Sequence, residues 1–273
     1  MALTKRELKQ DRQNWWYWKE RMAANQAELT EKSIKETERQ LIKYYQSANK
    51  KVIGQFEKTY YKLLSTIREG KEPTPADLYK LDTYWQMQGQ INRELRELGD
   101  LQLELLNKQF TEEWINIYEG LALPSGSAFG SIDKQMAQQM INSIWCADGK
   151  TWSERIWSNL DYLRETLNEG LLECVVTGKK PGELKNALQE RFGVSFNNAD
   201  MIVRTEMAHI QTQAAQKRYE DAGIEYVEVW ADKDERRCEV CGKLHQKRFP
   251  IGAQMPIPAH PRCRCSVIPV IDD

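Results

Sequence analysis

Apolar residues recur every three or four positions along much of the first 120 residues, as they do on the buried face of an α-helix. Residues 29–68 hold no proline and a single glycine and are rich in Glu, Lys, Gln and Leu, which favour helix. Residues 76–118 repeat the pattern after the breaker segment Gly70–Pro75. We therefore predict two long helices that pack as an antiparallel hairpin. Their apolar positions are Ile34, Leu41, Tyr45, Ile53, Phe56, Tyr60 and Leu64 in the first, and Leu78, Leu81, Trp85, Ile91, Leu95, Leu98 and Leu105 in the second.

Small residues and prolines divide the middle of the chain. Leu123–Ser127 contains Pro and Gly and is a candidate domain boundary. Two helices are predicted next, at 131–146 and 151–177, on either side of an Asp148–Gly149 turn. The expected caps of the second helix are Thr151 or Ser153 at its start and Gly178 at its end.

Two further helices are predicted before the pattern changes. Pro181 suits the first turn of a short helix at 181–191, which Gly193 would close. Asn197 or Asn198 would cap a longer helix that ends near Asp221.

From residue 224 the periodicity changes from helical to alternating. Residues 224–230 alternate apolar, often β-branched, residues with polar ones, which predicts a strand, whereas 231–261 are dense in Gly, Pro, Asp and Cys and predict loops and short strands. Residues 266–271 predict a second strand, at a sheet edge because Pro269 has no N–H to donate. The predicted fold is mostly α, with a long N-terminal helical hairpin, central helices and a small C-terminal α+β module. The corresponding domains are predicted at 1–122, 123–196 and 197–273.

Composition and charge exclude several classes of protein. Of the 273 residues, 41% are hydrophobic and 29% charged, a balance typical of a folded chain and not of a disordered one. The net charge of −1 gives the whole protein no electrostatic attraction for nucleic acid. No apolar run reaches the roughly 18 residues of a membrane span. Met1–Gln10 has no apolar core, so we do not expect a secretory signal.

The cysteines are unevenly distributed. Cys146 and Cys174 are isolated, whereas four others cluster near the C-terminus with a histidine. Cys-x-x-Cys places two thiolates on one metal ion, and a second pair some twenty residues later completes a tetrahedral set. Because a reducing compartment is expected, clustered cysteines indicate metal ligands before disulfides. The five candidate ligands are Cys238, Cys241, His260, Cys263 and Cys265.

Spacing alone does not choose four ligands from these five. His260 and Cys263 repeat the gap of the first pair, which favours the set of Cys238, Cys241, His260 and Cys263, with Cys265 as the alternative fourth ligand. Mixed thiolate and imidazole ligands suit zinc. A complete shell leaves no open position, so we predict one structural zinc ion per chain. The alternative is two disulfides or unliganded core cysteines.

The residues around this cluster resemble the phage minor head protein family, the head morphogenesis family with a Mu F-like domain. The resemblance rests on three elements in order: Val203-Arg-Thr-Glu206, then Trp230–His245 (WADKDERRCEVCGKLH), then Pro258–Cys265 (PAHPRCRC). It covers about residues 150–271. The opening segments Tyr17–Arg21 and Leu81–Trp85 also look like minor capsid proteins of phages that infect Gram-positive bacteria. The sequence departs from the family at Leu244–Arg248, where many relatives carry an Asp-Gly turn.

The resemblance implies a function that composition does not show. It implies a low-copy, non-enzymatic component of the virion, located in the capsid interior or at the portal vertex and in the host cytoplasm during assembly. Its implied partner is the portal protein, with major capsid or scaffold protein as further candidates. Its implied role is in head morphogenesis and in DNA packaging or ejection.

Other residues suggest alternative functions for the chain. Arg204 and Glu206, with His209 one turn further on, suggest a nuclease or an ADP-ribosyltransferase-like enzyme. Residues two apart on a helix point to different faces, so a structural role in which one of them supports the zinc module is favoured. His245 is a spare ligand candidate or a packing residue.

Two surface features are candidates for contact with partner molecules. Residues 232–265 carry a net charge of +4, which suits contact with DNA phosphates or a solvated face. The basic residues are Lys233, Arg236, Arg237, Lys243, Lys247, Arg248, Arg262 and Arg264. The aromatic run Trp15–Trp18 cannot lie wholly on one helix face, so part of it is expected to dock a portal or capsid protein.

Overall fold

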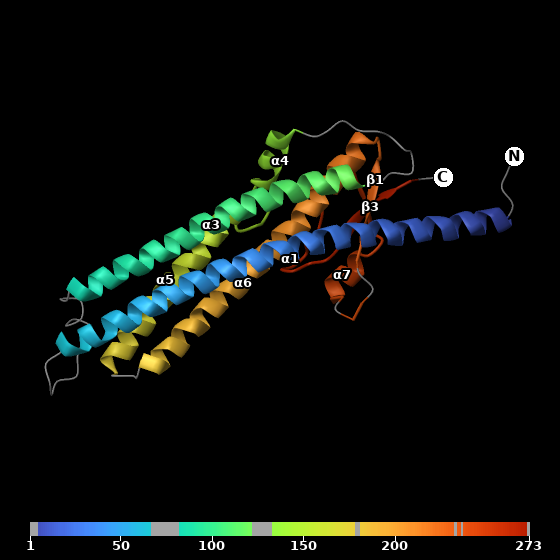
Figure 1. Ribbon diagram of the computed structural model, residues 1–273. Coiled ribbons are helices and arrows are strands. Elements are labelled where there is room, and N and C mark those ends of the chain that lie inside the picture. The colour runs from blue at the N-terminus through green and yellow to red at the C-terminus, as the bar shows by residue number, and fades with distance from the viewer. Residues whose placement is uncertain are drawn as a thin grey trace. The chain divides into compact units, whose positions relative to one another are not determined.

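A computed structural model describes residues 5–66, 82–121, 133–177, 181–231, 234–235 and 237–271 (Figure 1). Its side chains are described from Trp15 onward, apart from those at 60–66, 174–175, 181 and 184. The predicted breaks at Gly70–Pro75 and Leu123–Ser127, and the predicted helix end at Gly178, lie outside the described residues. The fold is mostly α with one small C-terminal sheet, as predicted. None of the described helices is long and apolar enough to cross a membrane.

The two longest predicted helices are confirmed. α1 covers Lys5–Thr66 and so begins 24 residues before the predicted start at 29, while α3 covers Asp82–Gly120. Contacts show that they run antiparallel, because Thr30 of α1 bonds Glu113 of α3 and the later Lys51 pairs with the earlier Glu94. Most of the predicted apolar positions face inward: Ile34, Leu41 and Phe56 of α1 and Ile91, Leu95 and Leu98 of α3 are all buried. The prediction was wrong for Trp85, which is 56% exposed.

The next two helices follow the predicted order but not all the predicted bounds. α4 covers only Lys134–Ile141, so the prediction of a helix over 131–146 was too long. Asp133 caps its start and Asn142 ends it, and the chain then turns through 142–150. α5 covers Trp152–Val176 and begins where predicted. Thr151 is its N-cap in a full capping box, because Thr151 and Glu154 each accept from the other's backbone N–H.

The predicted division near Gly193 was wrong. A single helix, α6, covers Pro181–Asp221 without interruption. An exposed glycine inside a helix costs roughly 1 kcal/mol relative to alanine, which packing can outweigh. The residues on both sides of Gly193 bury one continuous stripe, so the helix is held through the glycine. The stripe consists of Leu188, Phe192, Ser195 and Ala199.

Three short strands follow α6 and form an antiparallel sheet in the order β2-β1-β3. β1 is Tyr226–Trp230, β2 is Arg248–Pro250 and β3 is Ser266–Val270, and the short helix α7, Glu239–Leu244, lies between the first two. Both predicted strands are confirmed, and β3 lies at the sheet edge as Pro269 required. That edge is covered, because Gln26 of α1 and Tyr219 of α6 donate to the Val267 carbonyl.

The chain contains two compact units. The first comprises Met1–Glu36, Asn107–Ser143 and Val203–Asp273 and holds the sheet. Trp114 stacks on Tyr118 in its core, with ring centroids 5.5 Å apart, and the Tyr118 hydroxyl donates to Asp221. Buried side chains join α1 to the sheet: Gln211 donates to both Gln26 and Ser266.

The second unit comprises Thr37–Leu106 and Ile144–Ile202. Its polar centre is the buried Tyr45 hydroxyl, which lies within 3.4 Å of Gln102, Asn159 and Ser195. Burial raises the pKa of Tyr45 to about 12, so the phenol stays neutral. α3 and α5 come close at Gly99, where an added Cβ would lie 2.4 Å from the Trp157 ring.

A buried carboxylate in the first unit gives a pH prediction. Glu113, 1% exposed, accepts hydrogen bonds from Thr30 and Ser33, and burial raises its pKa more than these bonds lower it. The folded state therefore binds the proton more tightly than the unfolded state, so this contribution favours folding in acid and is lost as the pH rises through the folded pKa. Glu113→Gln should raise the melting temperature by a few degrees at pH 7, and the gain should shrink toward pH 4.

Thermal unfolding at both pH values measures this effect. Glu112→Gln is the matched control, because Glu112 is the exposed neighbour, with 52% of its side chain accessible. A loss of stability in Glu113→Gln that is larger at pH 7 than at pH 4 would show that the bonds from Thr30 and Ser33 outweigh desolvation.

Candidate metal centre

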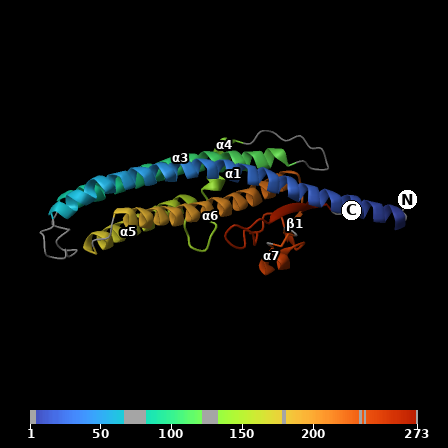
Figure 2. The ribbon, with the colours of Figure 1, turned by 60° about the horizontal axis from the view of Figure 1, so that its bottom comes forward.

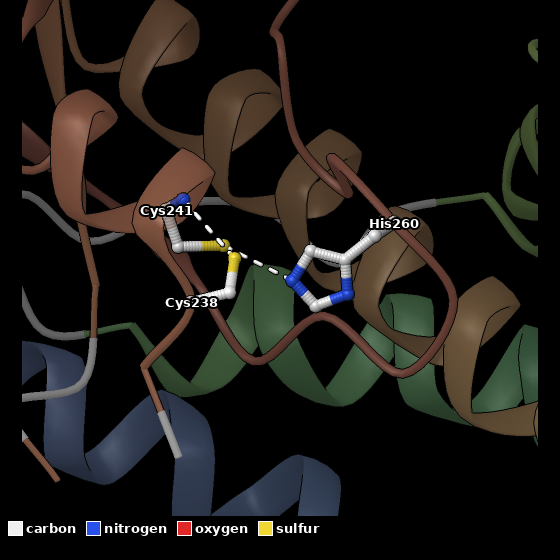
Figure 3. Close-up of side chains that lie close together, drawn as sticks. All are labelled: Cys238, Cys241 and His260. Atoms are coloured by element: carbon white, nitrogen blue, oxygen red, sulfur yellow. Dashed lines mark hydrogen bonds between the residues drawn. The ribbon is translucent and has the colours of Figure 1, made fainter. Parts of the chain in front are cut away.

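The first two ligand candidates are brought together by α7. Cys238 is the N-cap of this helix, and its Sγ accepts the backbone N–H of Cys241 at 3.3 Å. A side-chain acceptor at the N-cap satisfies a backbone donor that has no partner inside the helix. The same turn directs Cys241 inward, where it is buried, and leaves Cys238 half-buried (Figure 3).

His260 approaches this pair from the loop before β3. Its Nε2 is directed at the Cys241 Sγ (Figure 3), and the two atoms lie 3.2 Å apart. Its Nδ1 lies 2.8 Å from the Pro261 carbonyl, which can only accept, so Nδ1 carries the proton. Nε2 is then left with a lone pair directed at the cysteines. Metal-binding histidines are commonly oriented in this way by a hydrogen bond from the other ring nitrogen.

The remaining two candidates lie just before β3. Cys263 and Cys265 are both buried, and the Cys263 Sγ is 3.8 Å from the Cys241 Sγ. The ligand atoms fall into two overlapping groups, each within 4.8 Å of one another: Cys238, Cys241 and His260, and Cys241, Cys263 and Cys265. Cys241 is common to both groups and is therefore the centre of the cluster.

The protonation of the cluster follows from its contacts. The hydrogen bond from the Cys265 thiol lowers the pKa of Cys263 to about 5, and the same contact raises the pKa of Cys265. The backbone N–H of Cys241 lowers the pKa of Cys238, whereas burial raises that of Cys241 to about 12. The Pro261 carbonyl raises the pKa of His260. Two sulfurs, on Cys238 and Cys263, are thus held closer to the thiolate form that binds metals.

The donors fit a metal ion. A cavity of about 40 Å³ lies among them, lined in part by Cys238, Cys241, His260 and Cys265. The four cysteines of the cluster are thiols and are not joined in disulfides. Three buried or half-buried sulfurs and an imidazole nitrogen, or four sulfurs, can therefore hold a metal ion. All five predicted residues come together, and the choice of four among them stays a prediction.

The Arg-Thr-Glu segment lies on α6 beside this loop. Thr205 contacts it directly: the backbone N–H of Arg262 donates to the Thr205 Oγ1 at 3.1 Å. Arg204 instead pairs with Glu31 of α1 at 3.5 Å, and Glu206 is buried, with 4% of its surface exposed. The sequence predicted that Arg204 or Glu206 would support the module. It suggested Thr205 only as a candidate catalytic residue beside them and did not predict its contact with the loop. Thr205 and Arg262 are 57 residues apart, and no sequence pattern relates them, so their contact could not be predicted.

His245 has a packing role. Its Nδ1 accepts the backbone N–H of Ala231 at 3.2 Å, and its ring lies edge-on to Trp230 with centroids 4.8 Å apart. Trp230 also contacts Trp16 of α1 at 5.2 Å. Part of the N-terminal aromatic run therefore packs on the sheet, while Tyr17 and Trp18 are exposed.

The basic character of the module is partly neutralised. Arg264 forms two hydrogen bonds with Asp234, at 2.7 and 2.8 Å, and Lys243 pairs with Glu239 at 2.6 Å. Arg237 and Lys247 are exposed, whereas Lys233 and Arg236 lie outside the described residues. Contact with DNA stays a prediction.

Comparison with known proteins shows that part of the chain is similar to a known family. Residues 165–268, which include the end of α5, α6 and nearly all of the sheet module, match the family model described as Phage Mu protein F like protein. No curated protein and no solved structure matches the chain.

Proposed function

We propose, on the premise that residues 165–268 are a domain of the Phage Mu protein F-like family of phage head morphogenesis proteins, that this chain is a minor head protein. It is a low-copy structural component of the virion interior that associates with the portal protein. It acts in head assembly and in DNA packaging or ejection. The family match carries this proposal, and the resemblance of the segments flanking the cysteines supports it.

The metal in this proposal is zinc with a structural role. The support is chemical, because thiolates with one imidazole in a buried cluster suit tetrahedral zinc, and five candidate donors are enough to fill its four positions. Bound zinc would supply charge neutralisation for the thiolates and crosslink α7 to the loop before β3. Cys238 and Cys241 would hold it from one side, and His260 with Cys263 or Cys265 from the other.

The protein is proposed not to be an enzyme. A nuclease or transferase centred on Arg204 and Glu206 needs these side chains to meet a substrate in a cavity. Arg204 is engaged with Glu31, Glu206 is buried, and neither lines the cavity at the Cys/His cluster. These contacts favour a structural role for the segment.

Fractionation of infected cells tests the proposal. Antibody detection should find the chain in purified procapsids and virions at a small number of copies, and it should copurify with the portal protein. Absence from both particles would overturn the proposal. Purified protein should show no turnover of DNA, RNA or NAD. Turnover that Glu206→Ala abolishes, in a variant that keeps its circular dichroism spectrum, would establish the enzymatic alternative instead.

A further inference from the structure

The turn between two of the candidate ligands has a backbone that needs support. His260 and Cys263 are joined by a tight turn in which the Cys263 N–H donates to the His260 carbonyl at 3.2 Å. Within this turn Arg262 has a φ of 60°, in the left-handed region that disfavours residues with a Cβ. Such a conformation persists where neighbouring contacts hold it.

One such contact comes from Thr205. Its Oγ1 accepts the N–H of Arg262, the residue with the unfavourable φ, at 3.1 Å. Thr205 lies 57 residues earlier in the chain, on the long helix α6, so its position is set independently of the loop. The hydroxyl therefore ties a loop without regular structure to a rigid element, at the residue immediately before Cys263.

We propose that Thr205 is a positioning residue of the metal centre. By holding Arg262 in its left-handed conformation, it sets the separation and orientation of His260 and Cys263 in the folded module. When the module folds around the metal, this bond therefore favours the ligand geometry that the metal requires. Loss of the hydroxyl should weaken metal binding and change the ligand geometry without removing any ligand. This inference rests on the proposed zinc centre and is independent of the proposed role in the virion.

Variants of the full chain separate the hydroxyl from the rest of the side chain. Thr205→Val keeps the branched shape and removes the acceptor. Thr205→Ser keeps the acceptor. Thr212→Val is the matched control, because Thr212 is on the same helix and its hydroxyl bonds only within that helix in the contacts described, to the Ala208 carbonyl at 2.9 Å.

Zinc affinity is measured by competition with a chromophoric chelator, and ligand geometry by the visible absorption of Co(II) bound in place of zinc. Removing partners of metal ligands commonly costs 10- to 100-fold in affinity, and we expect about tenfold for Thr205→Val, with shifted Co(II) d–d bands. The zinc affinities of Thr205→Ser and Thr212→Val should stay within about twofold of the parent affinity, a change far smaller than the 10- to 100-fold range. Their Co(II) spectra should be unchanged.

Two results with the variants, and one with the parent chain, would overturn the proposal. Thr205→Val with parental affinity and spectrum would show that the hydroxyl does not position the ligands. Thr205→Ser as weak as Thr205→Val would assign the loss to packing. If Thr205→Val does not fold, Thr205→Ala takes its place in the same comparison. A parent chain that binds neither Zn(II) nor Co(II) would overturn the zinc centre and this role together, and would leave the virion assignment to be judged from fractionation.

Discussion

Removal of the metal is expected to unfold residues 237–265 while the long helices stay helical. Between Arg237 and Cys265 the described chain has one six-residue helix and one three-residue strand. Among the described side chains of this segment, Ile257 is the only buried apolar one outside the cluster. So little apolar surface cannot offset the entropy of ordering the loop. Structural zinc contributes about 10–16 kcal/mol in small zinc-dependent peptides, which is as large as the whole stability of an ordinary domain.

Hydrogen exchange measured by mass spectrometry locates the effect. Chelation should abolish protection in 237–265 and leave 37–66 and 82–106 protected, and near-ultraviolet circular dichroism should change because Trp230 loses the His245 ring. Elemental analysis of the purified protein should give about one zinc per chain, the stoichiometry of a single tetrahedral site. A metal-free protein with undiminished protection would contradict the prediction.

Cysteine variants show which donors are used. Cys241→Ser should lose the metal, because Cys241 belongs to both groups of ligand atoms, whereas Cys146→Ser, outside the cluster, should keep it. Cys263→Ser and Cys265→Ser decide the fourth position: the variant at a residue outside the shell keeps metal and fold, whereas loss in both variants indicates four sulfur ligands. Retention of zinc by Cys241→Ser would contradict a centre built around this residue.

Features with a local cause could be predicted from the sequence. The helical hairpin follows from apolar spacing, and the start of α5 from the Thr151–Glu154 capping box. The ligand candidates follow from Cys-x-x-Cys and His-x-x-Cys spacings, since each pair is brought together by a single turn. The short helix α7 could not be predicted, because its six residues depend on a thiol as N-cap.

Features set by distant contacts could not be predicted. Gly193 indicates a helix end, and only the buried stripe on either side of it, which includes Phe192 and Ser195, shows why α6 continues. The bond between Thr205 and Arg262 joins residues 57 apart, and that between Lys19 and Glu228 joins residues 209 apart. No periodicity relates such positions, so these long-range contacts could not be predicted, whereas the candidate ligands could be predicted from their spacing.

The Lys19–Glu228 pair gives the second large expected effect, because it joins α1 to β1 inside the first unit. The two charged atoms lie 2.7 Å apart, and the side chains are only 8% and 3% exposed. Lys19→Met keeps the length of the side chain but leaves the Glu228 carboxylate buried without its cation. Breaking one half of a buried pair costs about 3–5 kcal/mol. Denaturant unfolding, followed by tryptophan fluorescence, to which Trp16 and Trp230 contribute, measures the loss.

The double variant Lys19→Met/Glu228→Met separates charge from packing. When both charges are replaced by apolar groups of similar size, the desolvation penalty disappears, so most of the lost stability should return. Lys51→Met is the control for a surface pair, because Lys51 is 45% exposed beside Glu94 and Glu97, and it should change stability far less. If the double variant stays as unstable as Lys19→Met, the loss comes from the packing of α1 on the sheet. If Lys19→Met unfolds at the parental denaturant concentration, the pair does not hold α1 to β1.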